Sequence, residues 1–346
     1  MNYEEIMLRA ISEAEKYKYT AKPNPVVGAI LLKNEEIISE GYHKNYGKNH
    51  AEINAIINAN RQQNKKFNDF SELTLICTLE PCSHIGKTGS CAHAIVKTGI
   101  KKVIIGSIDP NPKVSGKGIQ ILRENNVHVD VGIHKDLVAK QNKFFFYRHI
   151  NNKPYITVKI ASSLDGKSHY ENHERVFVTS DKARLDVQLL RAKYDAILTG
   201  TNTLLNDNPR MNARVNFPVN QPEKILMSTS FSIEANTSEM PFFKGKRVTH
   251  FQHNDIDCVI PIMLENDKCS ILVEAGPKLT NAFLKTNYVD ELIIYKSQKK
   301  LGKTGISWFK EDNAVENYGF KLESSYKIGT DLKAVSYTHL TLPTKA

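Results

Sequence analysis

The sequence predicts an α/β protein built from two domains. Short apolar runs of the kind that form buried strands alternate with segments whose apolar residues recur at helical spacing, and this alternation is typical of a sheet covered by helices. At 346 residues the chain is long enough for two domains of ordinary size. Its 40% apolar and 24% charged content is typical of a globular protein. We expect a three-layer α/β sandwich over 1–148 and a second α/β domain over 149–335.

The first domain is predicted to begin with an amphipathic helix, because six apolar residues follow helical spacing: Tyr3, Ile6, Met7, Ala10, Ile11 and Ala14. Pro25 predicts a loop before the first strands. Ser90 and Gly99 stand where a helix over 91–98 would need its caps. The other expected elements are, in order, strands at 26–32 and 37–40, a helix from His50, strands at 73–79 and 103–108, a helix around 119–123 and a strand at 127–131.

The second domain repeats this alternation after an aromatic run that ends near Arg148. Thr179 or Ser180 is placed to cap a helix over 181–193, and Pro277 is placed in the first turn of a later helix. The expected strands are 155–161, 196–199, 224–227, 248–251, 270–274 and 291–296. The last stretch, 336–346, is rich in threonine, fits neither domain and resembles a non-native tail.

Two short motifs in the first domain predict a metal site. His50-Ala51-Glu52 is followed by Pro81-Cys82 and then by Cys91. One imidazole and two thiols form a soft ligand set suited to zinc, and three protein ligands leave a fourth position for water. Glu52 lies two residues past His50, where its carboxylate can move protons without binding the metal. The pattern is typical of zinc-dependent deaminases, although eight residues separate the cysteines here instead of the usual two.

Composition excludes several classes of protein. Five cysteines, an odd number, argue against a disulfide framework and favour a reducing cytoplasm. No apolar run is long enough to span a membrane, and the acidic Glu4 and Glu5 do not fit a signal peptide. The formal net charge of +10 comes from scattered lysines and arginines, which fits phosphorylated small substrates better than nucleic acid.

With these motifs the chain resembles, over nearly its full length, the bifunctional deaminase–reductase family of riboflavin biosynthesis. The motifs that carry the resemblance in the first half are Pro23-Asn24-Pro25-Val26-Val27-Gly28, Gly41-Tyr42-His43, His50-Ala51-Glu52, Thr78 to His84 with Gly86-Lys87-Thr88, and Asp109-Pro110-Asn111-Pro112. Those in the second half are Ser163-Leu164-Asp165-Gly166, Asp186 to Arg191, Asn206-Asp207-Asn208-Pro209 and Val273 to Pro277. The long gap between Cys82 and Cys91 is specific to this family among the deaminases.

The resemblance implies a cytidine-deaminase-like first domain and a dihydrofolate-reductase-like second domain. It implies that His50, Cys82 and Cys91 hold one zinc ion and that Glu52 is the general acid and base. The first step would hydrolyse the exocyclic amine of a diamino-hydroxy-phosphoribosylamino-pyrimidine, and the second would use NADPH to reduce its ribosyl group to a ribityl chain. The protein would be a cytoplasmic homo-oligomer that binds this small molecule and neither nucleic acid nor a membrane.

The resemblance also implies roles for individual residues. The expected substrate contacts are Asn24, His43, His84, Lys87, Asp109 and Asn111 in the first domain and Arg175, Arg191, Met211, Arg214 and Glu274 in the second. Among these, Arg191 and Arg214 would bind the substrate phosphate. The expected cofactor contacts are Ala161, Phe177, Thr203, Asp207, Thr229 and Gly276. The free N–H groups of the helix that follows Gly276 would hold the cofactor's pyrophosphate.

Simpler interpretations compete with these roles. Asn24 and Asn111 lie in proline-rich turns, Gly276 could belong to an ordinary strand-to-helix turn, and Arg191 and Arg214 could be solvated. In the second domain Arg175 replaces a small hydroxyl residue of the family and Phe177 replaces a tryptophan, so a deaminase with a degenerate second domain is an alternative function. A tRNA-editing deaminase and a structural zinc module are two further alternatives, which the motifs of the second half and the position of Glu52 disfavour.

Overall fold

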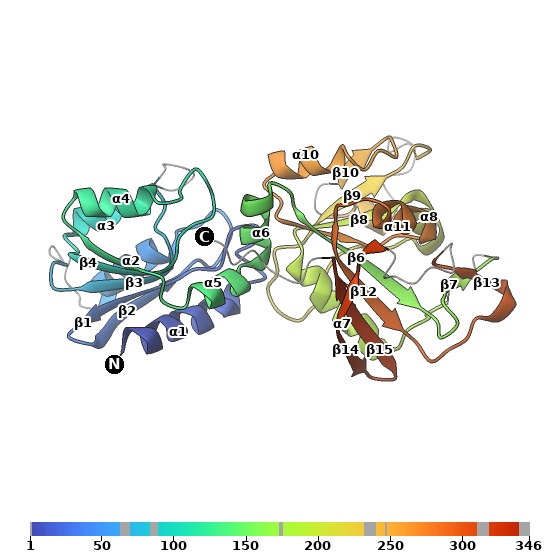
Figure 1. The fold of residues 1–346 in the computed structure, drawn as a ribbon, viewed down its shortest axis with the longest axis horizontal. Coiled ribbons are helices and arrows are strands. Elements are labelled where there is room, and N and C mark those ends of the chain that lie inside the picture. Colours follow the sequence, from blue (N-terminus) through green and yellow to red (C-terminus); the bar gives the residue numbers. More distant parts are fainter. Residues whose placement is uncertain are drawn as a thin grey trace. The chain divides into compact units, whose positions relative to one another are not determined.

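A computed structural model describes residues 2–62, 70–83, 89–172, 176–231, 240–245, 248–309 and 318–338. The chain divides into two compact units, Met1–Asn152 and Lys153–Ala346 (Figure 1). His84, Lys87 and Arg175, three of the expected substrate contacts, lie outside the described residues. None of the described helices has both the length and the apolar character that crossing a bilayer requires.

The first unit is built on a sheet of five strands in the order β2-β1-β3-β4-β5. These strands are β1 (Gly28–Lys33), β2 (Glu36–Tyr42), β3 (Thr74–Leu79), β4 (Lys102–Ser107) and β5 (His128–Val131). β1 runs antiparallel to both of its neighbours, whereas β3, β4 and β5 are parallel. The carboxyl ends of β3 and β4 therefore meet at one edge of the sheet, which is where Cys82 and Asp109 follow them.

Helices cover both faces of this sheet, so the predicted three-layer sandwich is confirmed. α1 (Tyr3–Ala14) packs against Ile30 and Leu32 of β1, whereas Ala29 and Leu31 of the same strand face the opposite layer. The opposite layer contains α2 (Ala51–Gln62), α3 (Cys91–Thr98) and α4 (Lys117–Glu124). The unit is completed by the 3₁₀ turn η1 (Glu15–Tyr17) and the helices α5 (Lys135–Gln141) and α6 (Lys143–Asn151).

A glycine brings the start of α2 directly onto the sheet. A Cβ atom at Gly41 of β2 would lie 2.2 Å from the carbonyl oxygen of Ala51 and 2.1 Å from the nitrogen of Ala55, a distance that no larger residue tolerates. This close contact fixes the first turn of α2, which carries Glu52, against the end of β2.

The second unit is built on a mixed sheet of eight strands in the order β10-β9-β8-β11-β6-β12-β15-β14. These are β6 (Tyr155–Ser162), β8 (Ala196–Gly200), β9 (Glu223–Met227), β10 (Val248–Phe251), β11 (Ser270–Val273), β12 (Val289–Lys296), β14 (Lys321–Ile328) and β15 (Asp331–Tyr337). The first six strands in this order, β10 to β12, are parallel to one another. β15 is antiparallel to β12, and β14 is antiparallel to β15. A separate pair joins β7 (Lys167–Tyr170) to β13 (Gly305–Ser307). The α/β prediction is thereby confirmed for this half.

The described helices of the second unit are α7 (Asp181–Lys193), α8 (Thr201–Asp207), α10 (Val259–Glu265) and α11 (Pro277–Leu284), with 3₁₀ turns η2 (Pro241–Phe243) and η3 (Gly302–Thr304). Ser180 caps α7, since its side chain accepts a hydrogen bond from the backbone N–H of Ala183. Gly276 and Pro277 begin α11 as the sequence predicts. The sequence did not predict α8, α10 or the strands β7, β13, β14 and β15.

Two predicted boundaries differ from the structure. Arg148 lies inside α6, which continues to Asn151 because its aromatic residues pack on the first unit. Ser336 and Tyr337 belong to β15, where they pair with β12 and β14. The prediction of a tail outside both domains is therefore wrong for these two residues, and 339–346 lie outside the described residues.

Candidate functional site

The three predicted metal ligands come together at the ends of three elements of the first unit. His50 directly precedes α2, Cys82 follows β3, and Cys91 is the first residue of α3. Their ligand atoms all lie within 4.8 Å of one another. The Nδ1 atom of His50 is 3.6 Å from the sulfur of Cys82 and 3.4 Å from that of Cys91. One imidazole and two thiols converging on one point fit a zinc ion with a fourth, open position.

The local structure favours the thiolate form of Cys82, which a metal ligand needs. The backbone N–H of Cys91 points at the sulfur of Cys82, 3.4 Å away, as expected for an anion at a helix N-terminus. Ser90 caps α3 and also donates a hydrogen bond to the carbonyl oxygen of Cys82. The hydrogen bond from the Cys91 thiol, assisted by His50, lowers the pKa of Cys82, whereas the same bond and burial raise the pKa of Cys91.

Glu52 is placed for proton transfer. It lies in the first turn of α2, two residues past His50, and its side chain is only 3% exposed. Burial raises the pKa of Glu52 to about 7. A buried carboxylate beside the metal ligands, and not among them, has the position of a general acid and base.

Asn24 and His43 form a pair beside His50. The amide nitrogen of Asn24 lies 3.1 Å from Nε2 of His43, and Nδ1 of His43 lies 3.1 Å from the carbonyl oxygen of Asn49. Burial lowers the pKa of His43, so the neutral ring accepts from Asn24 and donates to Asn49. The ring of His43 packs edge-on against that of His50.

The loop that carries Asn24 is held from a distant part of the unit. Asn142, buried between α5 and α6, accepts a hydrogen bond from the N–H of Val26 at 2.7 Å and donates one to its carbonyl oxygen at 3.1 Å. Gly28 in turn donates to the hydroxyl of Thr78. The backbone that leads from this loop into β1 is therefore fixed at Val26 and again at Gly28.

Asp109 and Asn111 lie after β4, next to Cys82. The carboxylate of Asp109 accepts a hydrogen bond from the N–H of Asn111 at 2.8 Å. Burial raises the pKa of Asp109 to about 7. The turn interpretation of this motif and its functional interpretation are thus compatible, because the turn itself brings both side chains to the edge where Cys82 lies.

In the second unit the expected residues gather at the carboxyl ends of four neighbouring parallel strands, which is the usual ligand-binding edge of such a sheet. Ala161 is near the end of β6, Thr203 follows β8, Thr229 follows β9, and Glu274 and Gly276 follow β11. A Cβ atom at Gly276 would lie 3.8 Å from the hydroxyl of Thr203, so these two expected cofactor contacts are neighbours. Asp207 ends α8 and is exposed.

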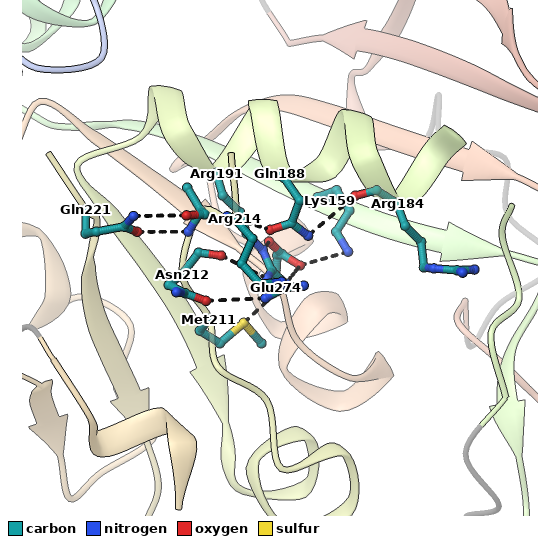
Figure 2. Close-up of polar contacts among 10 residues, drawn as sticks. Lys159, Arg184, Gln188, Arg191, Met211, Asn212, Arg214, Gln221 and Glu274 are labelled. Carbon is teal, nitrogen blue, oxygen red and sulfur yellow. Dashed lines mark hydrogen bonds and ion pairs between the residues drawn. The ribbon is translucent and has the colours of Figure 1, made fainter. Parts of the chain in front are cut away.

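A buried ion cluster lies at this edge (Figure 2). Glu274 accepts from Nε of Arg191 at 2.6 Å and from its Nη2 at 2.9 Å, and Nζ of Lys159 lies 2.9 Å from the same carboxylate. Burial alone would raise the pKa of Glu274, but Arg191 and Lys159 hold it well below its usual range. Arg191 is therefore an internal partner of Glu274 as well as an expected phosphate contact.

Arg214 is more exposed to solvent than Arg191 and lies near it. Its side chain is exposed and donates to the side-chain oxygen of Asn212 at 3.3 Å. Partial burial and the nearby charge of Arg191 lower the pKa of Arg214. Met211 is buried in the left-handed region at φ 45°, and its sulfur lies 3.6 Å from Nη2 of Arg191. The cluster is thus rich in positive charge, as a phosphate site requires.

Side chains fix the backbone of this segment (Figure 2). Gln221 accepts from the N–H of Ala213 and donates to its carbonyl oxygen, each at 2.9 Å. Gln188 of α7 accepts from the N–H of Arg214 at 3.1 Å.

The ring of Phe177 is exposed and stacks on the guanidinium group of Arg184. The ring is 53% exposed, and the guanidinium of Arg184 stacks on it with 4.3 Å between its central carbon and the ring centroid. Arg184 itself donates to the carbonyl oxygen of Thr179 and to Asp181. An aromatic surface held in this way is suited to stack on a flat ring of a ligand.

Lys159 is the functional candidate that the sequence did not reveal. It lies within the largely buried strand β6, and its pairing with Glu274 appears only in the folded chain. The one signal available was a single cation in a buried strand, which requires a buried partner.

Comparisons with known proteins agree with this geometry in both units. Residues 1–107 match the cytidine and deoxycytidylate deaminase zinc-binding region, and residues 154–334 match the RibD C-terminal domain. The riboflavin biosynthesis protein RibD of Buchnera aphidicola subsp. Baizongia pistaciae is 34% identical over 96% of this chain and 98% of its own length. The RibD of Escherichia coli K12 is 33% identical over 87% of this chain and 89% of its own.

Two solved structures resemble the whole chain. One form of Acinetobacter baumannii RibD is 31% identical, with 97% of this chain and 98% of the other covered and a TM-score of 0.84. A diaminohydroxyphosphoribosylaminopyrimidine deaminase/5-amino-6-(5-phosphoribosylamino)uracil reductase from Thermotoga maritima is 30% identical, with the same coverage and a TM-score of 0.81. The metal ligands with Glu52 in one unit, the ion cluster in the other and these full-length matches lead to one conclusion: the chain belongs to the RibD family of bifunctional deaminases and reductases of riboflavin biosynthesis.

Proposed function

We propose that this chain deaminates 2,5-diamino-6-(5-phosphoribosylamino)pyrimidin-4(3H)-one in its first unit and reduces the ribosyl group of the product in its second. The substrate is the one named for the Thermotoga maritima protein. The observation that carries the proposal is the buried Glu52 beside the converging His50, Cys82 and Cys91. This combination is suited to hydrolysis of an exocyclic amine.

Each unit takes one cofactor. Zinc fits the first unit, where His50, Cys82 and Cys91 would hold it and where it supplies Lewis-acid activation of a water molecule. NADPH belongs to the second unit and supplies the hydride. The residues proposed to contact it lie near the end of a parallel strand, in the segment after one, or in the loop before α7: Ala161, Phe177, Thr203, Asp207, Thr229 and Gly276.

In the deamination step the side chains of the first unit bind, orient and move protons. We assign to Glu52 the transfer of a proton from water to the departing ammonia. We assign contacts with the pyrimidine to two pairs of side chains, Asn24 with His43 and Asp109 with Asn111. His84 and Lys87 complete the expected contacts, although both lie outside the described residues.

In the reduction step the ion cluster binds the phosphoribosyl group. Arg214 is the more exposed cation and contacts the phosphate, with Arg191 behind it. Met211 shapes the same wall. Glu274 lies at the carboxyl edge of β11, where the sugar would meet the cofactor. Arg175 lies outside the described residues, and Phe177 keeps an exposed aromatic face, so the second unit retains the features of a reductase.

We also propose a reducing cytoplasmic location and a homo-oligomeric state. None of the five cysteines forms a disulfide, which supports the location. β14 forms an open edge of the eight-stranded sheet and exposes Leu322 and Tyr326, which supports association with a second copy. A small-molecule substrate fits both sites, and nucleic acid is not among the proposed partners.

Replacing Glu52 with glutamine tests the proposed deamination. The amide keeps the size of the side chain but cannot carry the proton, so we expect deamination to fall by at least about a thousandfold. Zinc content, and NADPH oxidation with the deaminated intermediate, should not change. Glu36→Gln on the exposed part of β2 is the matched control and should deaminate normally. Deamination by Glu52→Gln at close to the normal rate would remove the assigned role.

A further inference from the structure

A buried carboxylate next to a metal ligand has no role in the sites described so far. Glu80 connects β3 to Pro81 and Cys82, and it is 3% exposed. Its Oε2 atom accepts from the N–H of Asp109 at 3.2 Å and of Gly116 at 3.0 Å. Its Oε1 atom accepts from the N–H of Gly118 at 3.0 Å and of Ile119 at 3.2 Å.

These bonds satisfy the charge of Glu80 without a cationic side chain. Within the described part of the chain no ion pair includes Glu80. Burying a carboxylate is costly unless several donors surround it, and four backbone N–H groups do so here. Three of them belong to the beginning of α4, whose N-cap Gly116 has no side chain to offer. Glu80 therefore supplies from a distant strand the capping carboxylate that α4 lacks.

A second contact joins the same two segments. A Cβ atom at Gly118 would lie 1.9 Å from the carbonyl oxygen of Pro81 and 3.2 Å from Oε1 of Glu80. The first turn of α4 therefore packs directly against the residue that precedes Cys82, and only glycine allows this approach. Glu80 and Gly118 together fix α4, and the loop leading into it, to the segment that carries a metal ligand.

The loop held in this way carries two proposed substrate contacts. Glu80 accepts from the N–H of Asp109, Asp109 accepts from the N–H of Asn111, and Asn111 accepts from the N–H of Lys113. Each bond in this series orients the next residue. The position of Asn111 relative to Cys82 is thus set through Glu80.

We propose that Glu80 is a positioning residue for deamination, which holds Asp109 and Asn111 at the correct distance from the metal ligands. The inference rests on the assignment of Asp109 and Asn111 to the substrate site. A purely structural carboxylate would change stability and leave the Michaelis constant for the pyrimidine unchanged. A positioning carboxylate raises KM, because the substrate contacts move while the metal ligands and Glu52 stay in place.

Glu80→Gln tests this in the full-length, zinc-loaded protein with the pyrimidine phosphate as substrate. The amide keeps one acceptor oxygen but turns an NH₂ group toward two N–H donors, so one side of the carboxylate network is lost. We expect KM to rise about tenfold or more, with kcat within about threefold of normal and zinc content unchanged. Glu80→Asp keeps the negative charge on a side chain that is one methylene shorter. Its KM should lie between that of the unchanged protein and that of Glu80→Gln.

Asp195→Asn is the matched control in the second unit. Asp195 is also a buried carboxylate that accepts from backbone N–H groups, those of Cys269 and Ser270. Its replacement should lower stability and leave the KM for deamination unchanged.

Asn111→Ala separates the proposal from the assignment on which it rests. If Asn111→Ala raises KM and Glu80→Gln does not, the role of Glu80 is wrong and the substrate contact stands. If Asn111→Ala leaves KM unchanged, the substrate assignment fails, and the proposal for Glu80 fails with it. Loss of zinc from a folded Glu80→Gln, or failure of both Glu80 variants to fold, would give Glu80 a structural role only and overturn the proposal.

Discussion

Glu274 shows how much of the second site depends on single buried charges. Two cations reach the same carboxylate, Arg191 from α7 and Lys159 from β6. Removing one member of such a cluster destabilises the fold by more than the intact cluster contributes to stability, because the remaining charges are then buried without a partner. The same residues that would bind the substrate therefore also hold α7 against the sheet.

This cluster predicts sensitivity to acid. The folded-state pKa of Glu274 is lowered, so the stability that it contributes is present above the ordinary glutamate pKa of about 4.3 and is lost as the pH falls below it. We expect urea unfolding of the second unit, followed by the fluorescence of Trp308, the single tryptophan, to show a marked loss of stability between pH 6 and pH 3. Glu274→Gln should be less stable at pH 7 by about 3 kcal/mol and should depend less on pH over this range. If the stability of the unchanged protein and that of Glu274→Gln depended equally on pH, Glu274 would not be the source of the acid sensitivity.

Sequence information was sufficient for residues whose partners are close along the chain or belong to a recognisable motif. The convergence of His50, Cys82 and Cys91, with Glu52 two residues past His50, could be predicted because a metal site requires particular residue types at particular spacings. Lys159 could not, because its partner Glu274 follows another strand of the sheet, far away along the chain. The ion pair between Arg191 and Glu274 was hidden for the same reason.

At the scale of helices and strands, local signals predicted the ends of elements well. Ser90, Gly99 and Ser180 cap their helices as predicted, since capping depends only on neighbouring backbone groups. β14 could not be predicted, because its residues are exposed on both faces and show no alternation of apolar and polar residues. Its strand conformation comes from pairing with β15, which is a tertiary contact.

The cap of α3 has a consequence for the metal site. Ser90→Ala removes both the bond from the N–H of His93 and the bond to the carbonyl oxygen of Cys82. We expect the first unit to lose about 1 kcal/mol of stability and zinc affinity, measured by competition with a chelator, to fall about fivefold. Ser180→Ala removes the corresponding cap of α7 and should leave zinc affinity unchanged. If Ser90→Ala and Ser180→Ala changed zinc affinity equally, the cap of α3 would not support Cys91 as a metal ligand.

At the scale of the whole molecule, each compact unit carries its own core and its own candidate site. Both sites lie where the carboxyl ends of parallel strands meet, at β3 and β4 in the first unit and at β6, β8, β9 and β11 in the second. Two sites of different chemistry on one chain are what two consecutive reactions on the same phosphorylated pyrimidine require. The formal net charge of +10 is consistent with an anionic substrate.

Mass spectrometry of the reaction products tests this central claim most directly. The zinc-loaded protein is incubated with the diamino-pyrimidine phosphate, first without and then with NADPH. Without NADPH we expect a product in which one amine has been replaced by oxygen, and with NADPH a product that has also gained two hydrogens. Deamination that stops at the first product despite NADPH would contradict the assignment of the second unit, and the absence of any reaction would contradict both.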